Sequence, residues 1–333
     1  MTAAVDITLP VPPTAIPQLA REAEEAGLGG VWGHEASSDG FVTAAAAGMA
    51  TGRLRVGTDV AVAFARSPTI TAMAGLDLAE LSGGRFVLGL GSQVRRIVRD
   101  RFSAAYDHPA ARMAEYLQAV RAVFAAAGGD GDGFEGEYYR ITLPGAYPRP
   151  QPLPQAPPLH LAAVGPLMTR VAMTHADGIL GHPLTSLPYL RERLVPRTAD
   201  RGGRDVEVIT GVIVSVADDP RVAFERARLQ VAFYGTTPPY REIFEATGDH
   251  ELPDRLRAAW HGDRSRLAEA VPAEAVERYA IACTPDELGE RLAPYRQLVD
   301  RVILSVPSVG QPPDAVVDAT RAVIAAAATL TDP

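Results

Sequence analysis

The feature that most constrains the fold is a regular alternation of apolar β-rich runs with alanine-rich helical stretches along nearly the whole chain. Strands are expected at residues 5–9, 30–34, 54–64, 85–90, 159–164, 178–180, 206–216 and 301–306. Helical stretches follow these strands, for example at residues 13–26, 67–81 and 111–127. Because repeated strand–helix–strand units require a parallel sheet, about eight of them favour a closed (β/α)8 TIM barrel. An open, doubly wound sheet is the structural alternative.

Insertions interrupt the alternation after the fourth and the seventh strand. The expected insertions lie near residues 93–112, 128–158 and 235–280. The second of them combines a Gly/Asp loop, a short hairpin at 135–143 and a proline-rich extended connection at 144–158. Residues 237–280 are predicted to form extra helices. The sequence shows no internal repeat and no clear linker, so we predict a single domain over residues 1–333.

Composition and charge exclude several kinds of partner and site. The chain has 32 basic and 40 acidic residues, and a net charge of −8 argues against a nucleic-acid or anionic membrane surface. No charge-free apolar run is long enough for a membrane helix, and the first residues lack the pattern of a signal peptide. We therefore expect a cytoplasmic protein. The single Cys283 excludes an intrachain disulfide and a cysteine-based metal cluster.

The chain contains no lysine, which restricts its chemistry. A Schiff-base aldolase, a pyridoxal-phosphate enzyme and a P-loop all need a lysine amine, so these classes are excluded. Any phosphate must be held by arginine, hydroxyl or backbone N–H groups. The seven histidines are scattered without a metal-binding spacing, so no metal site is predicted. A hydrolase triad is also disfavoured, because no Gly-x-Ser-x-Gly motif occurs.

A parallel barrel places its active site at the carboxyl ends of its strands, and polar residues occur at these ends. His34 and Glu35 end the second strand. A histidine there can hydrogen-bond a ring carbonyl or donate a proton near neutral pH, whereas the alternative is a structural or helix-capping pair. Asp59 lies inside an apolar strand, where a carboxylate is costly unless it is paired. This cost favours a functional position for Asp59.

Three further strand ends contribute candidates. The Gly89-x-Gly91-Ser92-Gln93 segment leaves bare backbone that suits a flat ring or a phosphate, or else simply forms a tight turn. Proline after Gly165 leaves neighbouring N–H groups free to meet a phosphate, although an ordinary helix start has the same pattern. His182 follows the sixth strand and is a candidate cofactor contact. His160 begins the fifth strand, so we expect a structural role at the opposite face.

The segment LSGGRFVLGLG at residues 81–91 closely resembles the luciferase-like monooxygenase superfamily, which includes flavin enzymes and deazaflavin (coenzyme F420) enzymes. Residues 30–35, 54–62 and 161–166 support this resemblance, which covers nearly the whole chain in order. Residues 63–68, 91–93 and 108–113 are similar to a branch usually assigned to coenzyme F420.

This resemblance implies a set of cofactor contacts. Family members carry a bulge in strand three with a non-proline cis peptide that backs the middle ring, and here it should join Asp59 to Val60. Glu35 matches the acidic position at the end of strand two. Ser92 and Gln93 match family positions that contact the ring of the cofactor. The family positions whose backbone holds the phosphate correspond here to Val164, Gly165, Leu167 and Met168. With Gly91 and His182, these residues form the expected cofactor site.

The chain departs from the sugar-phosphate dehydrogenases of this superfamily. Their histidine after the strand-two acid and their glutamate after the strand-four turn are replaced by Ala36 and Val94. We therefore expect hydride transfer between coenzyme F420 and a less charged small organic substrate, with His34 and Glu35 as catalytic candidates. The alternatives are an FMN-dependent monooxygenase and a barrel that binds a flavin without turnover. The resemblance also implies a homodimer.

Overall fold

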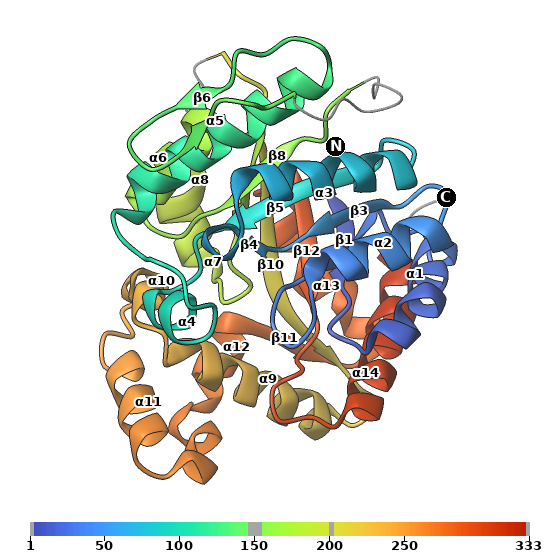
Figure 1. Ribbon diagram of the computed structural model, residues 1–333. Coiled ribbons are helices and arrows are strands. Elements are labelled where there is room, and N and C mark those ends of the chain that lie inside the picture. The colour runs from blue at the N-terminus through green and yellow to red at the C-terminus, as the bar shows by residue number, and fades with distance from the viewer. Residues whose placement is uncertain (1–2, 146–154, 200–202, 331–333) are drawn as a thin grey trace.

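The computed structural model describes residues 3–145, 155–199 and 203–330. Eight parallel strands close into a ring, and Figure 1 shows helices packed around these strands. The strands are β1 (Ala4–Thr8), β2 (Gly30–Gly33), β3 (Arg55–Thr58), β5 (Phe86–Gly91), β8 (Leu159–Ala162), β9 (Gly178–Gly181), β10 (Glu207–Val216) and β12 (Arg301–Ser305). The last strand pairs with the first, with Val5 opposite Val302, so the sheet has no open edge there. The (β/α)8 barrel is confirmed, and the open sheet is excluded.

Helices surround this ring. The principal ones are α1 (Ile16–Glu25), α2 (Gly40–Ala50), α3 (Pro68–Leu81), α5 (Pro109–Ala127), α6 (Pro166–His175), α9 (Pro220–Gly235), α13 (Leu288–Arg296) and α14 (Pro313–Ala327). Several begin with proline, whose fixed φ suits the first helical turn. Ser67 caps α3, because its hydroxyl accepts a hydrogen bond from the Ile70 N–H at 3.2 Å.

The interior of the barrel is packed with apolar side chains. Its members are Trp32, Val87, Leu180, Ile209 and Ile303, with Val60 and Ala162 packed against them. A second and larger apolar layer fills the space between the strands and the surrounding helices. The barrel is therefore a solid core whose reactive surface must lie at one of its ends.

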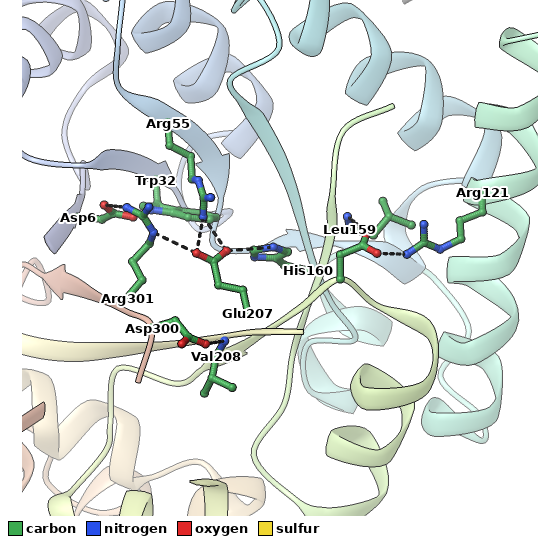
Figure 2. A network of polar contacts seen from close by, with 11 residues as sticks. Asp6, Trp32, Arg55, Arg121, Leu159, His160, Glu207, Val208, Asp300 and Arg301 are labelled. Atoms are coloured by element: carbon green, nitrogen blue, oxygen red, sulfur yellow. Dashed lines mark hydrogen bonds and ion pairs between the residues drawn. The ribbon is translucent and has the colours of Figure 1, made fainter. Parts of the chain in front are cut away.

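A charged network closes the amino-terminal end of the barrel, which we call the floor (Figure 2). Trp32 Nε1 donates to Asp6 Oδ2 at 2.8 Å, and Arg301 Nη1 lies 2.5 Å from Asp6 Oδ1. Arg55 Nη1 lies 2.7 Å from Glu207 Oε2. Arg301 also reaches Glu207, at 3.4 Å, so one guanidinium connects both carboxylates. Each buried charge therefore has an opposite partner, which burial requires.

His160 belongs to this floor, as its place at the start of the fifth strand predicts. Its Nε2 lies 3.6 Å from Glu207 Oε2, and its ring stacks on Trp32 with centroids 6.3 Å apart. Burial lowers the pKa of His160 to about 4, so the ring is neutral at neutral pH. The ring fills the space beside Gly178, where an added Cβ would lie 2.6 Å from Nε2.

The insertions contain elements that the alternation does not predict. The 93–112 segment includes the short helix α4 (Arg95–Asp100). The hairpin expected at 135–143 is present as β6 (Phe134–Glu135) and β7 (Arg140–Ile141), whereas residues 146–154 of the proline-rich connection lie outside the described residues. The helical stretch after β9 is divided into α7 (Leu187–Tyr189), a π-turn (Leu190–Leu194) and α8 (Val195–Thr198).

The last insertion contains α10 (Arg241–Glu245), α11 (Leu252–His261) and α12 (Ala273–Tyr279). An additional strand, β11 (Ala280–Cys283), follows them. The sequence predicts no strand here, and only Ala280 lies within the expected helical range 237–280. β11 pairs with the last four residues of β10, from Ile213 to Val216, so β10 continues past the ring before α9 begins. No helix among the described residues is long and apolar enough to cross a membrane.

Candidate active site at the barrel mouth

The mouth is the edge where the carboxyl ends of the strands meet, and a bulge in the third strand shapes it. β3 ends at Thr58, and pairing resumes at β4 (Ala61–Val62). The peptide bond between Asp59 and Val60 is cis, as the family resemblance implies. Thr58 Oγ1 donates to Gly89 O at 2.6 Å and accepts from Gly89 N at 3.0 Å, which fixes the bulge against β5.

The bare backbone of β5 accommodates this bulge. A Cβ at Gly89 would lie 1.8 Å from Thr58 O, and one at Gly91 would lie 2.6 Å from Val60 Cγ2. The missing side chains therefore make room for strand three. This packing accounts for both glycines without a cofactor, so a contact from Gly91 to a ring stays a prediction.

Glu35 is anchored to the segment that follows the bulge. Its Oε2 accepts from Val62 N at 2.6 Å, and Arg66 Nη1 lies 2.6 Å from its Oε1. Arg66 also pairs with Asp39 at 2.6 Å. Since both carboxylate oxygens have strong donors, the geometry suits Glu35 for positioning the bulge.

His34 and Asp59 differ from Glu35, because neither side chain has a hydrogen-bond partner within the described part of the chain. They lie on neighbouring strands, and Asp59 N donates to Gly33 O at 2.8 Å. Burial lowers the pKa of His34, so its ring is neutral near pH 7. Burial raises the pKa of Asp59 to about 7. The mouth therefore holds two uncommitted ionisable groups, one of which changes charge near neutrality.

An aromatic wall stands beside them. The His182 ring lies between two tyrosines, with ring centroids 3.9 Å from Tyr240 and 4.7 Å from Tyr234. Its Nδ1 accepts from Leu184 N at 3.0 Å, which leaves Nε2 as the protonated nitrogen of the neutral ring. Burial lowers the pKa of His182 to about 3, so it acts here as a neutral hydrogen-bond donor.

Tyr234 reaches the mouth from the far end of α9. It hydrogen-bonds Gln230 and Ser305, the latter at the end of β12. Burial raises the pKa of Tyr234 to about 12, and the nearby charge of Asp59 raises it further. A helix that follows a barrel strand normally leads away from the mouth. Because β10 continues beyond the ring, α9 begins outside it and its carboxyl end returns to the mouth.

The turn after β5 holds its own polar groups. Gln93 has φ 55°, an uncommon conformation for a residue with a side chain. Its backbone O accepts from Tyr106 OH and from Ser92 Oγ, each at 3.2 Å, and its Oε1 accepts from Val94 N at 3.0 Å. The Ser92 and Gln93 side chains thus stabilise the turn, and their expected ring contacts stay a prediction.

The expected phosphate cradle lies between β8 and α6. The Val164 carbonyl accepts from Tyr189 OH at 2.8 Å and from Arg197 Nη1 at 3.2 Å. Arg197 also forms an ion pair with Glu242 of α10. A Cβ at Gly165 would lie 3.7 Å from Glu242 Oε2, so this carboxylate borders the cradle.

Two other cradle residues differ in exposure. Leu167 is 64% exposed, whereas Met168 packs against the core. The role expected for them uses backbone groups in the first turn of α6, where N–H groups are free of helical partners. The predicted site residues lie at the carboxyl ends of strands, in the turns that follow them, or in the first turn of α6. They are His34, Glu35, Asp59, Val60, Gly91, Ser92, Gln93, Val164, Gly165, Leu167, Met168 and His182.

Sequence reasoning misses the residues that insertions and the helices after β9 and β10 bring to this edge. They are Tyr106, Tyr189, Arg197, Tyr234, Tyr240 and Glu242. The available signal is weak: three tyrosines lie in or beside segments recognised as insertions. No group of three or more histidine, cysteine, aspartate or glutamate side chains arranged for a metal ion lies within the described residues.

Comparisons with known proteins identify the family of this chain. Residues 2–301 match the family model described as luciferase-like monooxygenase. The chain belongs to the luciferase-like monooxygenase family. An uncharacterized protein of Mycobacterium tuberculosis is 40% identical over 306 residues, covering 86% of this chain and 90% of that protein. A putative coenzyme F420-dependent oxidoreductase of the same species is 30% identical over 307 residues, covering 85% and 87%.

Solved structures share the luciferase-like fold. The coenzyme F420-dependent tetrahydromethanopterin reductase of Methanopyrus kandleri superposes with a TM-score of 0.76 at 21% identity. The match covers 96% of this chain and 98% of that chain. At this identity the likeness supports the fold alone.

Proposed function

We propose that this protein is an oxidoreductase that transfers a hydride between coenzyme F420 and a small organic substrate at the barrel mouth. The observation that carries the proposal is the pair of unpartnered ionisable side chains, His34 and Asp59, beside the strand-three bulge. The 30% identical relative, named a putative coenzyme F420-dependent oxidoreductase, supports the choice of cofactor.

The residues present fit a flat ring attached to a phosphate. The bulge, which presents Val60, and the ring cluster of His182, Tyr234 and Tyr240 lie at the same edge of the barrel. The first turn of α6 offers backbone N–H groups for a phosphate. Glu242 borders this turn, but its negative charge is neutralised by the ion pair with Arg197, so it does not repel a phosphate there. Val60, Gly165 and Met168 would therefore hold the cofactor.

Bound coenzyme F420 supplies a carbon that gives or accepts a hydride, and the chain must handle the accompanying proton. At neutral pH His34 carries no extra proton, so it suits a proton acceptor or a neutral hydrogen-bond donor to a substrate oxygen. The sequence suggests that His34 donates a proton, and a neutral ring fits that role less well than the role of acceptor. Asp59, whose pKa lies at about 7, is protonated in part of the molecules and can donate. Glu35 holds the bulge in place.

The test is to mix the purified protein separately with coenzyme F420 and with FMN, and to measure the dissociation constant of each by fluorescence quenching. Tight binding of the deazaflavin, followed by a change in its absorbance with an organic substrate in a screen, is the expected result. Binding of FMN alone would favour the monooxygenase alternative. Deazaflavin binding without hydride exchange in any arm would favour the barrel without turnover.

We further propose a cytoplasmic homodimer. Two adjacent helices, α2 and α3, expose large apolar side chains away from the core. These are Val42, Met49, Ile70, Met73 and Leu81, which are 51–71% exposed. Apolar side chains gathered on neighbouring helices favour an interface, and a twofold axis would pair this face with itself.

A further inference from the structure

A strongly basic segment lies at the mouth of this acidic protein. Residues 95–101 contain four arginines and one aspartate, although the chain as a whole has a net charge of −8. Val98 is fully buried and anchors α4 to the protein. Arg95, Arg96 and Arg99 are exposed, as is Arg101 directly after the helix. The buried side of α4 thus holds the helix while its charged side faces the solvent.

Little of this positive charge is neutralised. Arg96 Nε lies 3.9 Å from Asp100, and both side chains are more than 60% exposed, so the pair contributes little. Arg99 has no ion pair or hydrogen bond with any residue the structure describes. Its guanidinium, with five donors in a planar fork, is available to an external carboxylate or phosphate.

The contacts of α4 and of the segment that follows it place this helix at the rim of the mouth. Arg101 donates to Ala36 O in the loop after β2. The Arg95 guanidinium lies 5.8 Å from the centre of the Tyr106 ring. Burial raises the pKa of Tyr240, and the nearby Tyr234 and Tyr106 hydroxyls raise it further, so Tyr106 neighbours the residue that precedes α10. Figure 1 accordingly draws α4 beside α10.

We propose that the α4 arginines bind the oligoglutamate tail of coenzyme F420. This inference rests on the proposed function. The tail extends from the cofactor's phosphate as a series of carboxylates, and arginine forms charge-assisted pairs with carboxylates. A phosphate at Gly165 would lie beside Glu242 of α10, and the tail would continue past α10 to α4. FMN ends at its phosphate and cannot use this surface, so α4 favours the deazaflavin.

The experiment measures dissociation constants for coenzyme F420 and for the same deazaflavin phosphate lacking glutamates. The variant is Arg96→Gln/Arg99→Gln. The matched control, Arg21→Gln/Arg53→Gln, removes the same charge from exposed positions on α1 and before β3. The variant should bind the tailed cofactor more weakly by about two- to fivefold per arginine, with the difference shrinking at high salt.

Binding of the tail-less ligand should be the same in the variant and the wild type. An equal loss for both ligands, or an equal loss in variant and control, would overturn the role of α4 while leaving the proposed cofactor intact. If neither deazaflavin binds the wild-type protein, the proposed function fails, and the tail site fails with it.

Discussion

Arg66 Nη1 lies 2.6 Å from Glu35 Oε1, and this partly buried ion pair joins the end of strand two to the segment after the strand-three bulge. The other oxygen of Glu35 accepts from Val62 N at 2.6 Å. The acidic position that the family resemblance marks as part of the site therefore holds the backbone that shapes the mouth.

Glu35→Gln should lower the free energy of unfolding by about 1–3 kcal/mol, because the Arg66 guanidinium loses the more buried of its two charged partners. Urea denaturation measures the change. The control is Glu22→Gln, whose carboxylate lies 3.0 Å from Arg321 Nε in a more exposed pair. It should cost less than about 1 kcal/mol. Equal losses in the two variants would contradict the anchoring role of Glu35.

Gly89→Ala should destabilise the protein by at least about 3 kcal/mol or prevent folding, since its Cβ would lie 1.8 Å from Thr58 O. The urea midpoint and the soluble yield measure this effect. Gly52→Ala is the matched control, because a Cβ there meets nothing within 4 Å. A Gly89→Ala protein as stable as the control would show that the bulge does not press on β5.

Asp59→Asn should remove a pH-dependent step from cofactor binding. The pKa of Asp59 is raised by burial to about 7, so above that pH a negative charge forms beside the site and weakens binding of an anionic cofactor. The wild-type dissociation constant should rise through pH 7, whereas that of the variant should stay flat. His34 and His182 are already neutral there, so they leave this step unchanged.

The same group sets a trend in stability. The carboxyl of Asp59 has a pKa of about 7 in the folded protein and an ordinary value of 3.8 in the unfolded chain. The folded state is therefore favoured fully below pH 3.8, and this stabilisation is lost as the pH rises through about 7. The effect is at most about 4 kcal/mol. Asp59→Asn should therefore gain most over the wild type, in thermal melts, above pH 7. A gain confined to acidic pH would contradict this assignment.

His160→Leu should reduce the loss of stability in acid. The pKa of His160 is about 4 in the folded protein, against an ordinary value of 6.5. The stabilisation that comes from the buried neutral ring is therefore complete above pH 6.5 and is lost as the pH falls through 4. Melting temperatures between pH 4 and 7 measure the slope, to which His182 also contributes. His250→Leu, at an exposed position, should retain the wild-type slope.

Met49→Glu/Met73→Glu should convert the proposed dimer into a monomer, because burying two new carboxylates in an apolar interface is costly. Analytical ultracentrifugation gives the mass. Leu143→Glu is the control: this side chain is 76% exposed and lies outside α2 and α3. A wild-type protein that sediments as a monomer would refute the proposed interface.

The alternation of strand and helix was sufficient to predict the closed barrel, because each βα unit carries its own local pattern. The positions of His34, Gly165 and His182 at strand ends followed from the same alternation, whereas Asp59 was expected inside a strand that in the structure ends at Thr58. The cis bond at Asp59 came from the family resemblance, since a single sequence contains no local signal for it. β11 was missed because Ala280–Cys283 is a short run between helices.

The sequence by itself determined which strands form the barrel and which polar residues follow the ends of these strands, since both depend on periodicity along the chain. Only the tertiary structure decided what these residues contact. It placed Thr58 against Gly89, Arg66 on Glu35 and Tyr234 beside His182. These contacts join segments far apart in the chain, and their geometry depends on how the bulge and the extended β10 direct the backbone, which no local pattern encodes.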